Sequence, residues 1–317
     1  MSEENQKYTI LLIVCILLVS VMTGTAEISG EKEIIFPEIA ALTVGAIASP
    51  KQSWKTSRLR MILMIAICSV FGILVVNFSP FCKTINLIFT FFAAQILFNF
   101  SKTTFAPMIS AAALPVLMGT ESVIYPVSAV TMTVLTAFAQ YVLEKNKMYE
   151  KQEFIPCKRP QKSDIAKTIL RTFFAAIISI PTIKFNLNFC VAPPLLVAFT
   201  EFSNPKSKAR KKPVKTFFII FSCAFFGAIS RIVFCEILSL PLTFAAVFSI
   251  AFALIIMKSA KQFIPPAAAL GILPLIIQKK YLYIYPVEIA VGCLFFMLSA
   301  MCFRENQTDN TSEKNRI

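Results

Sequence analysis

Lys261-Gln-Phe-Ile-Pro-Pro-Ala-Ala-Ala-Leu-Gly-Ile-Leu-Pro274 is an apolar segment interrupted by prolines. A similar segment, Lys102-Thr-Thr-Phe-Ala-Pro-Met-Ile-Ser-Ala-Ala-Ala-Leu-Pro115, precedes it at a constant offset of 159 residues, which pairs Lys102 with Lys261 and Pro107 with Pro266. At an offset of 160 residues, Tyr125-Pro-Val127 pairs with Tyr285-Pro-Val287. The chain therefore looks like two copies of one unit.

The pairing extends outward from these segments. At an offset of 155, Cys68 falls on Cys223 and Gly72 falls on Gly227. We therefore predict a first membrane repeat over 1–143, a basic cytoplasmic linker over 144–165, a second membrane repeat over 166–303 and a polar cytoplasmic tail over 304–317.

Composition places the chain in a membrane. The 317 residues are 56% hydrophobic, with a mean hydropathy of +0.71 and only one Trp. Apolar runs of about 16 to 22 residues with few charges recur along the chain, which is typical of an all-α, polytopic transmembrane bundle. The polar stretches lack apolar periodicity, so no soluble catalytic domain is expected.

The apolar runs predict twelve spans, six in each copy. Because six is even, both copies enter the membrane from the same side, and the repeats are parallel. Several runs are shorter than the roughly 20 residues that a straight span needs, so some are expected to be re-entrant half helices. The predicted spans are 8–26, 34–50, 61–78, 84–100, 104–119, 123–143, 166–183, 189–203, 216–235, 240–257, 262–278 and 282–303.

The net charge of +14 comes from 31 Lys and Arg against 17 Asp and Glu. Most basic residues sit in short loops, which favours a topology signal over nucleic-acid binding. With a cytoplasmic N-terminus, loops 51–60, 144–165 and 204–215 all face the cytoplasm. We therefore predict a plasma membrane protein with both termini cytoplasmic, in contact with the bilayer, and leave homo-oligomerisation open.

Several kinds of chemistry are disfavoured by residue usage. The chain contains no histidine, the commonest general base and metal ligand. Its nine cysteines lie mostly in apolar runs without a CxxC pair, which predicts buried thiols. We expect no enzyme activity, no metal site and no cofactor.

Each copy has two proline-marked segments, which are rich in small residues. Proline lacks a backbone N–H and breaks or starts a helix, and broken helices in corresponding places often mark a transporter's central site. The alternative is that proline is merely common in membrane helices and that the small residues serve close packing. Four segments in two-fold correspondence favour a pathway. Its candidate residues are Pro37, Pro107, Pro193, Pro194, Pro265 and Pro266.

Ionisable residues at membrane depth are costly and usually face a bundle interior. Arg171 and Arg231 lie within spans, and Glu38 follows Pro37 near the end of one. We select Glu38 and Arg231 as pathway candidates, with structural pairing as an equal alternative. The remaining pathway candidates are Glu288, Lys102 and Lys261, and for each we favour a simpler explanation. Glu288 is explained by helix capping, and the two lysines by the cytoplasmic preference of lysine.

A family resemblance rests on the second copy. Ala192-Pro-Pro-Leu-Leu-Val-Ala-Phe-Thr-Glu-Phe-Ser-Asn-Pro205 resembles the HPP family of integral membrane proteins, as does Ile264-Pro-Pro-Ala-Ala-Ala-Leu270 leading to Tyr285-Pro-Val-Glu-Ile-Ala-Val-Gly292. The resemblance covers most of 166–303 and, more weakly, the first copy. It implies two fused helical membrane units, and some plastid and cyanobacterial members are linked to nitrite transport.

This chain departs from the family at the residue that names it. Ile264, and Phe105 in the other copy, stand where the family has histidine. The role of that histidine, and nitrite as the substrate, are therefore not carried over. The resulting hypothesis is a permease or secondary transporter for a small solute such as an anion. The alternatives are a non-catalytic membrane scaffold or sensor subunit, and less favoured, a membrane-embedded lipid-modifying enzyme.

Overall fold

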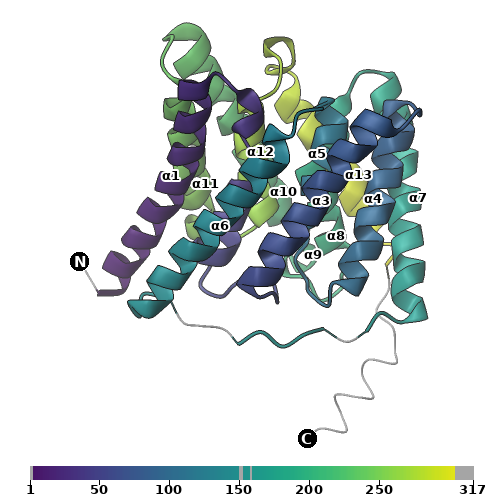
Figure 1. The fold of residues 1–317 in the computed structure, drawn as a ribbon, viewed down its shortest axis with the longest axis horizontal. Coiled ribbons are helices and arrows are strands. Elements are labelled where there is room, and N and C mark those ends of the chain that lie inside the picture. Colours follow the sequence, from purple (N-terminus) through teal and green to yellow (C-terminus); the bar gives the residue numbers. More distant parts are fainter. Residues whose placement is uncertain (1–2, 150–152, 158, 304–317) are drawn as a thin grey trace, which may run out of the picture.

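The computed structural model describes residues 3–149, 153–157 and 159–303, and within these ranges the chain is helical without strands (Figure 1). The predicted all-α class is confirmed. Seven of the described helices are long and apolar enough to cross a membrane, rather than twelve. They are α1 (Glu3–Ser29), α3 (Arg58–Phe78), α4 (Lys83–Phe100), α6 (Ile124–Lys145), α7 (Lys162–Lys184), α10 (Pro213–Ser230, continued by a π-helical stretch Arg231–Ile237) and α11 (Leu242–Ser259).

Four short helices occupy the predicted proline-marked segments. They have 6, 12, 10 and 8 residues, too few to cross a bilayer as straight helices. Proline suits the first helical position, because its missing N–H would have no partner there, and each short helix begins at or directly after one. These helices are α2 (Glu38–Thr43), α5 (Pro107–Met118), α8 (Pro193–Phe202) and α12 (Pro265–Ile272). A last helix of intermediate length, α13 (Tyr285–Ala300), follows α12.

The short helices form the centre of the molecule. Helix α2 contacts α12 and α5, and α8 contacts the same two, so the four close into a ring. Nearly all of their residues are buried, while the long helices around them keep large apolar side chains exposed. The segments that cannot span a membrane are therefore enclosed by helices that can.

Close backbone contacts hold the short helices against the long ones. A Cβ atom on Gly72 of α3 would lie 2.3 Å from the carbonyl oxygen of Ala112 in α5. A Cβ atom on Gly227 of α10 would lie 2.1 Å from the carbonyl oxygen of Gly271 in α12. Only glycine allows these approaches, and small residues commonly mediate helix packing in membranes.

Two tyrosines make equivalent contacts with the short helices. The Tyr125 hydroxyl donates to the carbonyl oxygen of Ala111 at 2.9 Å, and the Tyr285 hydroxyl donates to that of Leu270 at 2.7 Å. The tyrosines correspond at the offset of 160 and their acceptors at 159. The two-copy, six-span architecture stays a prediction.

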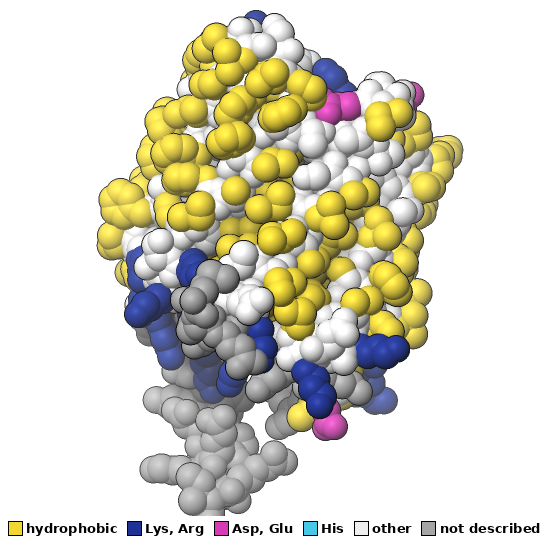
Figure 2. Space-filling view, turned by 90° about the vertical axis from the view of Figure 1, so that its left-hand side faces the viewer, with side chains coloured by type: hydrophobic (Ala, Val, Ile, Leu, Met, Phe, Trp, Pro, Cys, Tyr) yellow, Lys and Arg dark blue, Asp and Glu magenta, His cyan; other side chains and the backbone are white. Residues whose placement is uncertain are grey.

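The surface is divided between apolar and basic regions. Figure 2 shows yellow apolar side chains over most of one face and Lys and Arg gathered at its lower end. The described part of the linker runs along this same end between α6 and α7, so we call it the linker end (Figure 1). This pattern fits a multi-pass membrane protein. The plasma membrane and the cytoplasmic placement of the linker end stay predictions, and the tail 304–317 lies outside the described residues.

The paired lysines Lys102 and Lys261 end α4 and α11 in the left-handed conformation, with φ of 55° and 50°. Glycine is favoured at this position, and a β-branched residue is strongly disfavoured. Lys261→Val is expected to lower the free energy of unfolding by about 1 kcal/mol or more, while Lys261→Gly is expected to be tolerated. Thermal unfolding in detergent measures both variants. Lys215→Val, at an exposed helical position of α10, is the control, and an equal effect at the two sites would contradict the backbone explanation.

Candidate functional site

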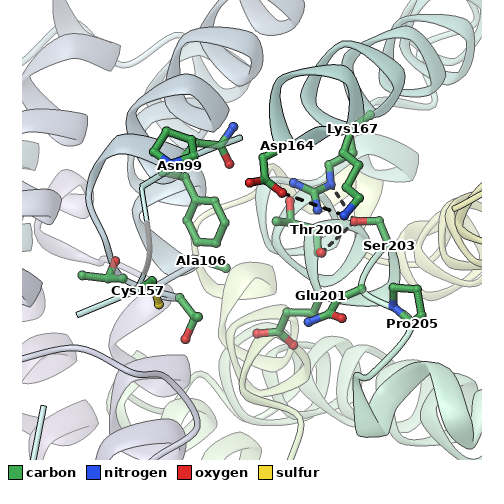
Figure 3. Close-up of a pocket in the computed structure, with 15 residues that line it drawn as sticks. Asn99, Ala106, Cys157, Asp164, Lys167, Thr200, Glu201, Ser203 and Pro205 are labelled. Carbon is green, nitrogen blue, oxygen red and sulfur yellow. Dashed lines mark hydrogen bonds and ion pairs between the residues drawn. The ribbon is translucent and has the colours of Figure 1, made fainter. Parts of the chain in front are cut away.

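A cavity of about 310 Å³ lies at the linker end. Figure 3 shows that residues before the linker and in it form one wall, while residues of α7 and α8 form the other. Its lining residues are Phe98, Asn99, Thr103, Thr104, Ala106, Cys157, Pro160, Asp164, Lys167, Arg171, Thr200, Glu201, Ser203, Asn204 and Pro205. The cavity is therefore built where the two predicted repeats meet.

Arg171 of α7 is the central cation of the cavity wall. Its residue is 8% exposed, and its guanidinium donates from Nε to Ser203 Oγ at 2.6 Å and from Nη1 to Gln95 Oε1 at 3.0 Å. Gln95 in turn donates to Thr200 Oγ1 at 2.5 Å. Both of these acceptors are neutral, and among the described residues Arg171 has no ion pair within 4 Å, although Asp164 on the same lining interacts with its charge at longer range. A buried guanidinium of this kind keeps its positive charge available to a ligand.

Glu201 lines another part of the wall and is hydrogen-bonded to Trp54, which is not itself a lining residue. Trp54 donates from Nε1 to Glu201 Oε1 at 3.2 Å, and its ring packs edge-on against Phe105 at 5.4 Å between centroids. The same ring lies directly over Gly45, where a Cβ atom would meet it at 2.3 Å. The chain after α2 thus returns into the centre of the bundle and contacts α8.

The remaining charges at the cavity are partly paired. Asp164 and Lys167 form an ion pair at 3.8 Å, drawn as a dashed line in Figure 3. Ala106 precedes the first turn of the 12-residue helix α5, whose N-terminal dipole adds partial positive charge. Arg171 and this helix end make one region of the cavity suitable for an anion, while Glu201 supplies an acid on the same lining.

The predicted site residue Glu38 lies in the ring of short helices. It is 1% exposed, and one carboxylate oxygen accepts a hydrogen bond from Ser110 of α5. Its other oxygen, Oε2, has no hydrogen-bond partner. Glu38 does not line the cavity that contains Arg171.

The predicted site residue Arg231 directly follows the last residue of α10, at the end of that helix away from the linker end. Its Nη1 donates to the backbone carbonyls of Pro274 and Ile277, and its Nη2 lies 3.9 Å from a carboxylate oxygen of Glu236. Glu236 also accepts a hydrogen bond from Lys279 at 2.7 Å, which raises the pKa of Lys279. Arg231 thus satisfies carbonyls of the segment that follows the short helix α12. It shares no contact with Glu38, and its predicted role in a pathway stays a prediction.

The other predicted residues have structural contacts. Glu288 Oε2 accepts a hydrogen bond from the Phe189 backbone N–H at 2.7 Å, which ties α13 to the turn before α8. Lys102 and Lys261 occupy helix-ending turns, and neither lines the cavity. The candidate prolines lie at the starts of the short helices, as predicted, and their place on a pathway stays a prediction. They are Pro37, Pro107, Pro193, Pro194, Pro265 and Pro266.

Arg171 and Gln95 were missed as candidates by the sequence reasoning. Arg171 carried a usable signal, because an arginine within an apolar segment is costly unless it has a role. Gln95 carried no such signal, because a glutamine within a span does not stand out until its partner Arg171 is known.

Comparisons of the chain with family models, with curated proteins and with solved structures found no match. The resemblance to the HPP family therefore stays a prediction.

Proposed function

We propose that this protein is a multi-pass membrane permease for a small anion, built from two tandem HPP-like units. The observation that carries the proposal is the buried Arg171 guanidinium on the wall of a cavity, with neutral hydrogen-bond acceptors as its partners. Keeping a cation at membrane depth costs several kcal/mol, so a function that uses its charge explains its presence.

The surrounding architecture supports a transport role. Transporters commonly bind solutes where discontinuous helices meet at the interface of two repeats. Here the cavity is lined from α8 and from the residue before α5, two short helices that contact each other. The equivalent tyrosine and glycine contacts of the two halves support the duplication. In this proposal the linker-end cavity serves as the vestibule of the pathway, and the buried ring of short helices closes the pathway beyond it.

Uptake into proteoliposomes tests the proposal. The purified full-length protein is reconstituted, and uptake of chloride, nitrate, nitrite, phosphate, formate and acetate is compared with protein-free liposomes. At least one anion is expected to enter faster and with saturation, because a cavity of this size holds a small solute. Rubidium serves as the cation control.

Flux of rubidium without flux of any anion would overturn the anion assignment. Absence of flux for the whole panel would favour a scaffold or sensor subunit. A change in the liposome lipids that depends on the protein would favour the lipid-modifying enzyme.

A further inference from the structure

A second, separate cavity lies on the lipid-facing side of the linker end. It has a volume of about 460 Å³, within the range of small-molecule sites. It runs between the first turns of α10 and the last turns of α13, and Phe202 of α8 forms part of its wall. Apart from Arg210, all its lining residues are apolar. They are Phe202, Ala209, Pro213, Val214, Phe217, Leu294, Met297, Leu298, Ala300 and Met301.

A basic segment borders this groove. The short helix α9 (Lys208–Lys211) carries Arg210 into the groove lining, and Lys208, Lys211, Lys212 and Lys215 around it are exposed. The Nη1 atom of Arg210 is buried and has no hydrogen-bond partner. Residues 202–230 and 289–303, which supply most of the lining, contain no Asp or Glu. Within the described residues, the groove thus combines an apolar body with a positive rim, and none of its lining residues is acidic.

The segment that carries Arg210 is fixed in place. Thr216 Oγ1 donates to the Ala209 carbonyl at 2.9 Å, and Gln262 Nε2 donates to Thr216 Oγ1 at 2.7 Å. Helix α9 is therefore anchored to α10 and to the turn before α12. Arg210 is presented at the groove from a supported position rather than from a free loop.

The corresponding junction of the first half contains an ion pair within the protein. There, Arg58 at the start of α3 forms an ion pair with Glu144 near the end of α6. At the offsets of the predicted repeat, these two positions become Pro213 and Arg304. Arg304 lies outside the described residues, but an arginine cannot replace the acid. At the position that corresponds to Glu144, the sequence of the second half therefore has a basic residue instead of an acid.

We propose that the groove between α10 and α13 binds an anionic phospholipid, with an acyl chain in the apolar groove and the phosphate on Arg210 and its neighbouring lysines. An anion with an apolar tail matches both parts of the site, and anionic lipids are attracted to basic segments next to a membrane. A guanidinium binds phosphate oxygens through paired hydrogen bonds. This site is distinct from the cavity of Arg171 and does not depend on transport.

Native mass spectrometry of the full-length protein in detergent tests this site. Phosphatidylglycerol is expected to remain bound in preference to phosphatidylcholine. Arg210→Gln is expected to reduce the bound phosphatidylglycerol about tenfold, because it removes a charged hydrogen-bond donor. Leu298→Trp narrows the groove from an exposed rim position and is expected to reduce binding without changing any charge.

The matched control is Lys51→Gln, which removes one exposed cation at the linker end of the other half. Its phosphatidylglycerol binding is expected to equal that of the unaltered protein. An equal loss in Lys51→Gln and Arg210→Gln would show diffuse attraction and overturn the site. Equal retention of the two phospholipids, or preferential retention of oleic acid, would also overturn it. Leu298→Trp keeps the test decisive if Arg210→Gln fails to fold.

Discussion

Gly227→Ala is expected to lose about 3 kcal/mol or more of folding free energy, the upper range for overpacking a core. The added Cβ would lie 2.1 Å from the Gly271 carbonyl oxygen and 2.8 Å from its carbonyl carbon. These are backbone atoms of α12, so no side-chain rotation relieves the contact. Helix α10 therefore has to move away from α12, which loosens the packing of the ring of short helices against the long helices around it. Thermal unfolding of the purified protein in detergent, with its yield from membranes, measures the effect.

Gly24→Ala in α1 is the matched control. Its Cβ would meet only the Thr243 hydroxyl at 3.9 Å, an ordinary contact. Alanine is favoured over glycine within a helix by roughly 0.5 to 1 kcal/mol, so this variant is expected to be unchanged or more stable. If both variants unfold at the same temperature as the unaltered protein, the close packing of α10 on α12 is wrong.

Arg171→Gln is expected to lower anion uptake tenfold or more while changing thermal stability much less. The substitution removes the charge that the proposed ligand requires, and one hydrogen bond to a charged group contributes about 1.5 to 3 kcal/mol. Stability is largely kept because the hydrogen bonds lost to Ser203 and Gln95 are offset by removing the cost of burying an unpaired charge. Arg171→Lys keeps the charge but not the planar donor pair, so intermediate uptake is expected. Initial uptake rates into proteoliposomes, with unfolding temperatures, give both quantities.

Arg58→Gln controls for loss of a positive charge near the linker end. Arg58 pairs with Glu144 and stacks over Tyr141, away from the cavity that Arg171 lines. Uptake in this variant is expected to match that of the unaltered protein. Unchanged uptake in Arg171→Gln would remove Arg171 from the binding site, while parallel losses in Arg58→Gln and Arg171→Gln would indicate a general charge effect.

Much of the fold could be read from the chain because proline acts locally. Pro107, Pro193 and Pro265 each fix the first turn of a short helix, since proline sets φ and lacks the N–H that a helix interior needs. The apolar runs therefore located the helical segments well. How many of them are full spans could not be read from the chain, because hydropathy does not distinguish an apolar segment that faces lipid from one that is enclosed by other helices.

The site was less predictable because it depends on distant pairs. In the sequence Arg171 and Arg231 look alike, because each is a single arginine within an apolar segment. Arg171 meets Gln95 from 76 residues away and lines a cavity, whereas Arg231 meets the carbonyl of Ile277 from 46 residues away and holds the segment that follows α12. The partner, rather than the residue type, separates a candidate ligand-binding group from a structural one.

The position of Trp54 gives the protein an optical reporter. It is the only tryptophan of the chain, and its indole is 3% exposed beside Phe105, with its N–H on Glu201 of the cavity lining. Indole emission responds to the polarity and charge around the ring. The tryptophan emission of the unlabelled protein therefore originates from a single place, the contact between the loop after α2 and α8. Titrating solutes against that signal can follow occupancy of the cavity without a transport assay.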